Sequence, residues 1–313
     1  MIYSPIVLFV YNRPESTIEV LNSLALNKES KFSDLIIFCD GPKSDNEILL
    51  SQISKVRKIV KSENRFGSVK IIENTSNKGL AKSVFDGVSE VFCSYDRIIV
   101  LEDDLIVAPF FLKYMNDSLN RYELNENVGQ IGACNYFACG SKYPSSFFIP
   151  IADCWGWATW QNRWKKYIHS IEEIEYNLEK DKKLLNKFNA YGSYNFSRLL
   201  NLQKSKAVSS WAIHWHSTCI LNNWLILYPN PSMSQHISSI DFTHETINIT
   251  PPLCTEEPIF ETKEVEEIYG VIKAMKRGYS MIGDYYGNLS FKLILLKMIS
   301  SVKKRIFRIT TIF

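Results

Sequence analysis

The sequence predicts an α/β fold: a doubly wound, mainly parallel sheet flanked by helices, with an amphipathic helix at the C-terminus. Two observations lead to this class. Four short, almost wholly apolar runs alternate with helical stretches in the first hundred residues, as expected of strands that are buried on both faces. Each run also ends in polar or turn-forming residues, and the carboxyl ends of the strands in such a sheet form its ligand-binding edge.

The first three predicted strands cover residues 5–10, 35–39 and 69–73. The first leads through Tyr-Asn-Arg-Pro at 11–14 into a helix expected from about Glu15 to Leu26. The second ends in Asp-Gly-Pro at 40–42, where glycine and proline turn the chain and should leave Asp40 on the rim, able to meet a ligand. The third leads into Asn-Lys-Gly-Leu-Ala at 77–81, whose Gly79 should open a helix to about Val91.

The fourth strand, 97–101, stops on three consecutive carboxylates, Glu102, Asp103 and Asp104. Packed side by side they should raise one another's pKa, so their clustering favours a bound cation. Carboxylate oxygens indicate Mg²⁺ or Mn²⁺. The alternative is a solvated strand-to-helix turn in which Asp104 is the N-cap.

In this order the four motifs resemble those of glycosyltransferases with the GT-A (Rossmann-like) fold. The resemblance is to family 2-type bacterial enzymes and to the N-acetylglucosaminyltransferase I group, whose acidic motif is also Glu-Asp-Asp. It continues through Cys-Trp-Gly-Trp-Ala-Thr-Trp at 154–160, Ser-Trp-Ala-Ile-His-Trp at 210–215 and the segment 235–244, and so covers roughly residues 3 to 245.

The resemblance implies a nucleotide-sugar donor whose diphosphate carries Mn²⁺ or Mg²⁺. Asp104 should ligate the ion, and His244 matches a histidine that many enzymes of this fold use as a second ligand. The donor itself should be contacted by residues from all four strand ends: Tyr11, Arg13, Asp40, Asn77, Gly79, Glu102 and Asp103.

Glycosyl transfer also needs a base that takes the proton of the acceptor hydroxyl, ideally a carboxylate. In the N-acetylglucosaminyltransferase I group an aspartate follows the tryptophan, but this chain has Ala212 and Ile213 there. Three residues could replace that aspartate, in order of preference Asp153, His214 and Asp241. A histidine at 214, between two tryptophans, is more often a packed, hydrogen-bonded core residue than a base, and the same holds for His216 in the same segment.

Four tryptophans between residues 155 and 164 exceed what core packing usually requires. We expect two of the four to be core residues, and Trp155 or Trp157 to face the acceptor or donor, because aromatic faces pack well against sugars. Gly156 would let the backbone approach the acceptor closely. The charged stretch 165–195 should form helices that wall the acceptor side.

These motifs predict the organisation of the chain. Residues 1–130 form the nucleotide-sugar-binding half and 131–250 the acceptor-binding half of the same GT-A domain. A connecting segment, 251–288, then leads to a helix over 289–313. The seven cysteines have no paired spacing, which favours reduced thiols in a cytoplasmic protein. The first ten residues lack the basic region of a secretion signal.

The C-terminus is strongly basic. From Gly270 onward the chain has nine of its 36 Lys and Arg residues but one of its 33 acids. Within 289–313 apolar residues recur at helical spacing among the basic ones, a pattern that suits an anionic membrane surface. A helix that docks on the catalytic domain or on a second subunit is the alternative; nucleic acid is disfavoured because base-stacking aromatics are lacking.

The sequence therefore predicts a metal-dependent, inverting glycosyltransferase of the hexosyl or N-acetylhexosaminyl type, peripheral on the inner face of the cell membrane. Its donor would be UDP-linked, and its acceptor a glycan or lipid-linked saccharide in capsular, O-antigen or lipo-oligosaccharide synthesis. A catalytically weak nucleotide-sugar-binding or scaffold protein is the alternative, and an oligomer is possible. A sugar nucleotidyltransferase would need a glycine-rich phosphate loop after the first strand, and residues 11–15 contain no glycine.

Overall fold

The computed structural model describes residues 3–237, 251–257 and 264–281. An eight-stranded sheet in the order β3-β2-β1-β4-β8-β6-β9-β7 forms its centre. Strands β3, β2, β1 and β4 are parallel, β6 is parallel to β9, and β8 and β7 run antiparallel to their neighbours. The predicted mainly parallel sheet is confirmed. The strands are β1 (Ile6–Val10), β2 (Asp34–Cys39), β3 (Ser68–Glu73), β4 (Arg97–Glu102), β6 (Val128–Gly132), β7 (Ser146–Ile149), β8 (Trp157–Trp160) and β9 (Leu225–Pro229).

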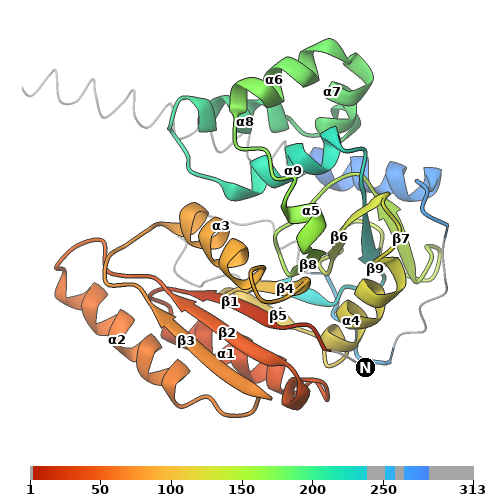
Figure 1. Cartoon of the computed structure of the whole chain (residues 1–313). Coiled ribbons are helices and arrows are strands. Elements are labelled where there is room, and N and C mark those ends of the chain that lie inside the picture. Colours follow the sequence, from red (N-terminus) through yellow and green to blue (C-terminus); the bar gives the residue numbers. More distant parts are fainter. Residues whose placement is uncertain (1–2, 238–250, 258–263, 282–313) are drawn as a thin grey trace, which may run out of the picture.

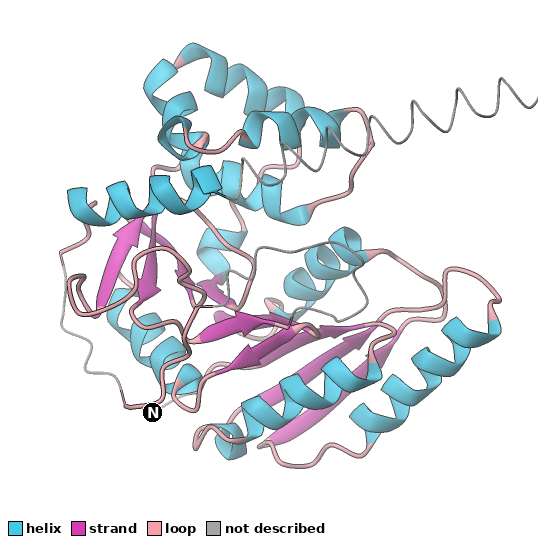
Figure 2. Cartoon of the chain, turned by 180° about the vertical axis from the view of Figure 1, so that it is seen from behind, coloured by secondary structure: helices cyan, strands magenta, loops and turns pink. Residues whose placement is uncertain are grey.

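Helices cover both faces of the sheet (Figures 1 and 2). Alternate residues of β1 point to opposite sides, so Ile6 and Leu8 pack in one core cluster and Val7 and Phe9 in the other. The first cluster lies under α1 (Pro14–Ala25), α2 (Glu47–Lys61) and α4 (Phe111–Tyr122), and the second under α3 (Leu80–Val91) and α9 (Trp211–Leu221).

Helices α1 and α3 lie within one residue of their predicted bounds. Gly79 precedes α3 with φ +77°, a left-handed conformation that favours glycine. The chain after Glu102 differs from a strand-to-helix turn: the short strand β5 (Leu105–Val107) follows and pairs with β10 (Ser234–His236). Asp104 is therefore not a helix N-cap.

A helical layer follows β8 and stands above α9 in Figure 1. Its own apolar cluster, with Ile174, Leu178 and Phe188 at its centre, packs on Ile213 and Ile220 of α9. Helix α9 is buried almost all round, which explains its nearly uniform apolar composition. The expectation of helices in the stretch 165–195 is confirmed. The layer consists of α6 (Ile171–Lys180), α7 (Lys182–Phe188), the 3-10 turn η2 (Ala190–Gly192) and α8 (Phe196–Lys204). Helix α5 (Gln161–Trp164) directly follows β8 and precedes the layer, and the 3-10 turn η1 (Ser30–Phe32) lies between α1 and β2.

The segment after the predicted acceptor half contains a helix over 269–281. Its buried residues Val271, Met275 and Tyr279 join the second core cluster. Gly278 allows this close packing, because a Cβ there would lie 2.8 Å from Cβ of Phe137. The helix thus belongs to the folded domain.

Among the residues described, no helix combines the length and apolar character needed to cross a bilayer. All seven cysteines are free, and only Cys93 is exposed. The helix predicted over 289–313 lies outside the described residues.

Candidate active site

Two central strands bring their polar ends together at the carboxyl edge of the sheet. Strands β1 and β4 are parallel neighbours, so the residues that follow Val10 and Leu101 lie side by side. The backbone N–H of Tyr11 donates to Oδ2 of Asp103 at 3.2 Å. The sheet register itself thus places the first motif against the acidic motif.

Arg13 bridges the two aspartates of the acidic motif. Its Nη1 lies 2.8 Å from Oδ2 of Asp104 and 3.3 Å from Oδ1 of Asp103. Burial disfavours the charged guanidinium, but the two carboxylates outweigh burial and raise the pKa of Arg13. The side chain remains 47% exposed, so it can also reach a ligand.

His236 is a site residue that the sequence analysis missed. Pairing of β10 with β5 places it opposite Leu105, and its Nε2 lies 3.3 Å from Oδ2 of Asp104. Its ring packs on Trp155 at a centroid distance of 5.2 Å. The segment 235–244 had been matched to the family, but the ligand was assigned to His244, eight residues later. His244 and the candidate base Asp241 lie outside the described residues.

The three acids have different pKa values. Burial, followed by the charges of Asp104 and Asp103, raises the pKa of Glu102 to about 8. Burial also raises that of Asp103 to about 6, with Asp104 adding to it and Arg13 opposing it. Burial would raise the pKa of Asp104 too, but His236 and Arg13 outweigh it and lower that pKa. Asp104 is thus the carboxylate that stays ionised most readily.

Trp211 links the acidic motif to the helical layer. Its indole donates a hydrogen bond to the Glu102 side chain, and its ring stacks on Trp157 at 5.2 Å. Because Trp211 is the first residue of α9, this contact ties the helical layer to the end of β4.

Asp153 lies close enough to His236 for a charge on that histidine to lower the pKa of the Asp153 carboxyl group. Its Oδ1 accepts a hydrogen bond from the Trp155 backbone N–H at 3.0 Å. Burial is the largest effect and raises the pKa of Asp153 to about 6, so the carboxylate is ionised but basic near neutrality. Buried Tyr279 and partly buried Tyr136 lie close by; burial raises the pKa of both hydroxyls, and the Asp153 charge raises it further.

The two histidines of α9 lie in packed surroundings. Nδ1 of His214 is 3.1 Å from the Ile168 carbonyl, and the ring stacks on Tyr167. His216 accepts from the Ala152 backbone N–H, so its Nε2–H donates to the Phe188 carbonyl at 3.0 Å. These partners match the core interpretation of both residues, and the structure does not bring His214 to the acidic motif.

Asp40 is at the end of β2 as expected, but it is buried and not on the rim. Its Oδ1 accepts from the backbone N–H groups of Gly41 and Lys78, and its Oδ2 from Gly79 N–H and the Asn77 amide, all within 3.0 Å. The carboxylate therefore holds the loop before α3 in shape. The expected position of Asp40 on the rim was wrong, because Gly41 turns the chain closely against the backbone of Ser76 in the neighbouring loop. Contact of Asp40 with the donor stays a prediction.

Three of the four tryptophans are core residues, one more than expected. Trp157 is 1% exposed, so it has no face for the acceptor and its predicted contact is corrected. Trp155 is half-buried and packs between His236 and Tyr136. Gly156 is buried with φ +83°, where a Cβ would lie 3.3 Å from Oγ of Ser234. It brings the start of β8 against β10.

The described residues fit a metal ion that arrives with a diphosphate. Asp104 and His236 present one oxygen and one nitrogen toward each other. No group of three or more His, Cys, Asp or Glu side chains within the described part of the chain is arranged to hold an ion. Mg²⁺ sites commonly take one or two carboxylates, with substrate phosphates and water as the remaining ligands. The Tyr11 hydroxyl is buried and has no partner among the described residues, and the backbone N–H of the same residue contacts Asp103.

The family model described as glycosyl transferase family 2 matches residues 6–194, which includes the acidic motif and the tryptophan segment. The chain belongs to glycosyl transferase family 2. Its sheet and helices are those of the GT-A fold, as the sequence predicted.

Solved structures similar to this chain include three of TarS from S. aureus. One shares 16% identity, with a TM-score of 0.30 over 47% of this chain and 25% of that chain. Residues 1–349 of TarS share 10%, with a TM-score of 0.37 over 72% and 60%. The same residues in complex with UDP share 14%, with a TM-score of 0.29 over 44% and 38%. The chain covers less than two thirds of each. No curated protein matched the chain.

Proposed function

We propose that this glycosyltransferase moves a hexosyl or N-acetylhexosaminyl group from a UDP-linked donor to a lipid-linked saccharide, with inversion, in cell-surface polysaccharide or lipopolysaccharide synthesis. The observation that carries the proposal is the convergence of Arg13, Asp104, His236 and Asp153 at one edge of the sheet. Cationic, metal-binding and basic groups are the three requirements of transfer from a diphosphate.

Asp104, with His236 beside it, would hold Mn²⁺ or Mg²⁺. The ion supplies positive charge to the departing diphosphate. Arg13 would bind the diphosphate through its exposed guanidinium, and Tyr11 and Glu102 would line the donor pocket. The nucleoside end of the donor pocket would be shaped by the loop before α3, which contains Asn77 and Gly79 and is held by Asp40.

Asp153 would be the base. As the acceptor oxygen forms its bond to the anomeric carbon, the bond from that carbon to the diphosphate breaks, and the hydroxyl proton passes to the Asp153 carboxylate. A pKa of about 6 suits a base that works near neutral pH. Trp155, with its half-buried ring beside His236, would support the acceptor sugar.

The acceptor class rests on the basic C-terminal segment. Its apolar and basic residues suit an anionic membrane surface, and an enzyme held there meets lipid-linked saccharides at a raised effective concentration. Residues 1–130 and 131–250 would then be the donor and acceptor halves, and 289–313 the membrane-surface helix on the inner face of the membrane.

A thermal-shift panel tests the donor site. UDP, GDP, CMP and dTDP would each be added with and without Mn²⁺ to wild type, Asp104→Asn and a control, Asp117→Asn, whose carboxylate pairs with Lys113 on α4. A ligand at 100 times its Kd stabilises by about 2.7 kcal/mol. We expect Mn²⁺-dependent stabilisation by UDP in wild type and in the control, and its loss in Asp104→Asn.

No metal-dependent shift with any nucleotide would overturn the donor-site proposal and favour a scaffold protein. A shift with another nucleotide would correct the donor. Donor hydrolysis or transfer by the purified protein, absent in Asp104→Asn, then separates an enzyme from a binder.

A further inference from the structure

Arg13 occupies the position of a cation. Its Nη1 lies within 3.3 Å of one oxygen on each of the two aspartates, and the contact with Asp104 is the shorter, at 2.8 Å. Asp104 is also the residue beside His236, where the ion would be held. The same oxygen, Oδ2, accepts from Arg13 and faces His236. A cation approaching Oδ2 therefore competes with the guanidinium for it.

The charge of the motif explains why the arginine is there. Asp103 is buried and Asp104 partly buried, and two adjacent carboxylates without a counterion would repel each other in a medium less polar than water. Arg13 supplies the opposite charge from within the chain. A free divalent ion would meet a site whose negative charge is already partly compensated, and would be repelled by the guanidinium as well.

Arg13 can also leave. Its side chain is 47% exposed, and the contacts with the two carboxylates use one nitrogen of a group that has five N–H donors in a planar fork. That fork matches two phosphate oxygens, and such paired contacts are among the strongest hydrogen bonds of proteins. A diphosphate thus offers Arg13 better partners than the aspartates, and frees Oδ2 as it does so.

We propose that Arg13 is a displaceable internal counterion, which weakens the binding of metal alone and passes from Asp104 to the diphosphate when the nucleotide and the metal bind together. The inference rests on the proposed donor site. This displacement of Arg13 makes the binding of metal and nucleotide cooperative. The coupling must be reciprocal, so each ligand raises the affinity for the other by the same factor.

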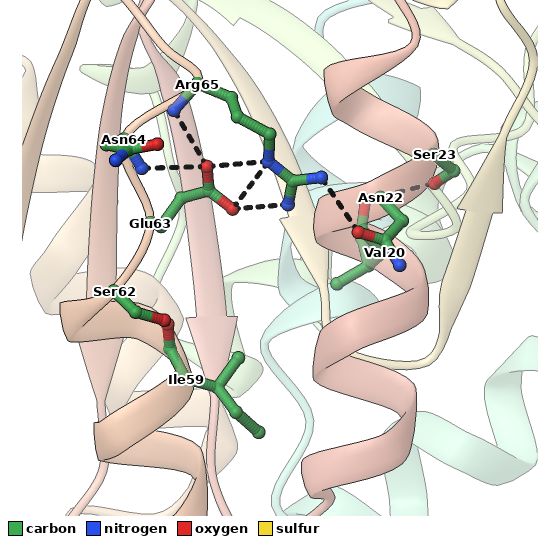
Figure 3. A network of polar contacts seen from close by, with 8 residues as sticks. All are labelled: Val20, Asn22, Ser23, Ile59, Ser62, Glu63, Asn64 and Arg65. Carbon is green, nitrogen blue, oxygen red and sulfur yellow. Dashed lines mark hydrogen bonds and ion pairs between the residues drawn. The ribbon is translucent and has the colours of Figure 1, made fainter.

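The test measures the binding of Mn²⁺ alone, by the electron paramagnetic resonance signal of the free ion and by calorimetry. The proteins are wild type, Arg13→Gln, Arg13→Lys and the control Arg65→Gln. Arg65 forms an ion pair with Glu63 and donates a hydrogen bond to Asn22 of α1 (Figure 3). It lies in the loop between α2 and β3, at the edge of the sheet opposite the acidic motif. The control substitution therefore removes an ion-paired arginine whose side-chain exposure is similar to that of Arg13, and leaves the acidic motif unchanged.

Coupling between two ligand sites is typically 5- to 150-fold. We expect Arg13→Gln to bind Mn²⁺ alone about tenfold more tightly than wild type, and to lose most of the cooperativity between Mn²⁺ and UDP. Arg13→Lys keeps the charge and should bind Mn²⁺ alone nearly as weakly as wild type. Arg65→Gln should leave both quantities unchanged.

Equal affinity of wild type and a folded Arg13→Gln for Mn²⁺ alone would overturn the proposal. If Arg13→Gln does not fold, then Mn²⁺ binding to wild type that is as tight without UDP as with it would overturn it equally. The two proposals fail separately. Loss of every metal-dependent nucleotide effect in wild type removes the donor site, whereas intact cooperativity in Arg13→Gln removes only the role of Arg13.

Discussion

Asp153 is the residue whose surroundings best suit proton abstraction. Asp153→Asn should lower kcat/KM by about 10²- to 10⁴-fold, the usual contribution of a general base. The stabilisation by nucleotide and Mn²⁺ should persist, because the donor contacts come from other residues. In wild type, kcat/KM should fall as the pH drops below about 6, where the Asp153 carboxylate takes up a proton. Initial rates over a pH series measure both effects.

A matched control is Asp117→Asn, which removes a surface carboxylate paired with Lys113 on α4. It should leave the rate and its pH dependence unchanged. An Asp153→Asn enzyme with wild-type rates would transfer the role of base to Asp241.

His216 makes the stability of the fold depend on pH. Burial lowers its pKa from 6.5 to about 4, so the folded protein binds fewer protons than the unfolded chain between these values. Its stabilising contribution is complete above pH 6.5 and is lost as the pH falls through 4. Between pH 7 and pH 4, the free energy of unfolding of wild type should fall by about 3 kcal/mol more than that of His216→Gln. Urea unfolding of both proteins across this range measures the difference; parallel curves would show that His216 does not titrate this way.

The loop after Asp40 is packed so closely that adding a side chain at Gly41 should destabilise the fold. A Cβ on Gly41 would lie 2.4 Å from the backbone carbon of Ser76, in the loop that the Asp40 carboxylate holds. Because backbone cannot move aside as a side chain can, Gly41→Ala should destabilise the protein by about 1–3 kcal/mol or more. It should also weaken the nucleotide response, since this loop leads into α3. Urea unfolding and the thermal-shift assay measure the two effects.

Gly270→Ala is the control for this change. No atom lies within 4 Å of a Cβ built at Gly270, so its effect should stay within about 1 kcal/mol and favour the helix over 269–281. Equal destabilisation by both substitutions would mean that steric contact with Ser76 is not the cause.

Local patterns predicted the elements well and their long-range contacts poorly. Buried strands such as β1 and β4 have an apolar run that ends in polar residues, and this local pattern predicted both strands. His236 joins the site only because β10 pairs with β5, more than a hundred residues earlier in the chain, and no local pattern specifies that pairing. Trp157 and Trp155 have the same chemistry, so only the sheet's geometry shows that one is core and the other half-buried.

At the scale of the whole molecule, the second core cluster joins the sheet and its helices to the segment 264–281. Glu267 pairs with Lys187 at 2.8 Å and accepts a hydrogen bond from Tyr191, and Tyr279 packs near Asp153. A chain that ends at residue 263 should therefore lose stability and activity together, because it uncovers the apolar surface beneath the helix over 269–281. Thermal unfolding and donor hydrolysis measure this loss; an active, stable chain of this length would contradict it.

A chain that ends at residue 281 should behave differently. It keeps every contact made among the described residues, so its melting temperature and its nucleotide response should match those of the full chain. It loses the six basic residues of 289–313, each of which contributes about 1 kcal/mol near an anionic membrane surface. In co-sedimentation with vesicles, the full chain should bind phosphatidylserine-containing membranes, release at high salt and ignore neutral phosphatidylcholine, whereas the shortened chain should bind neither. Equal sedimentation of the two chains would place membrane attachment elsewhere on the protein, and the acceptor would then have to be sought without the help of a lipid surface.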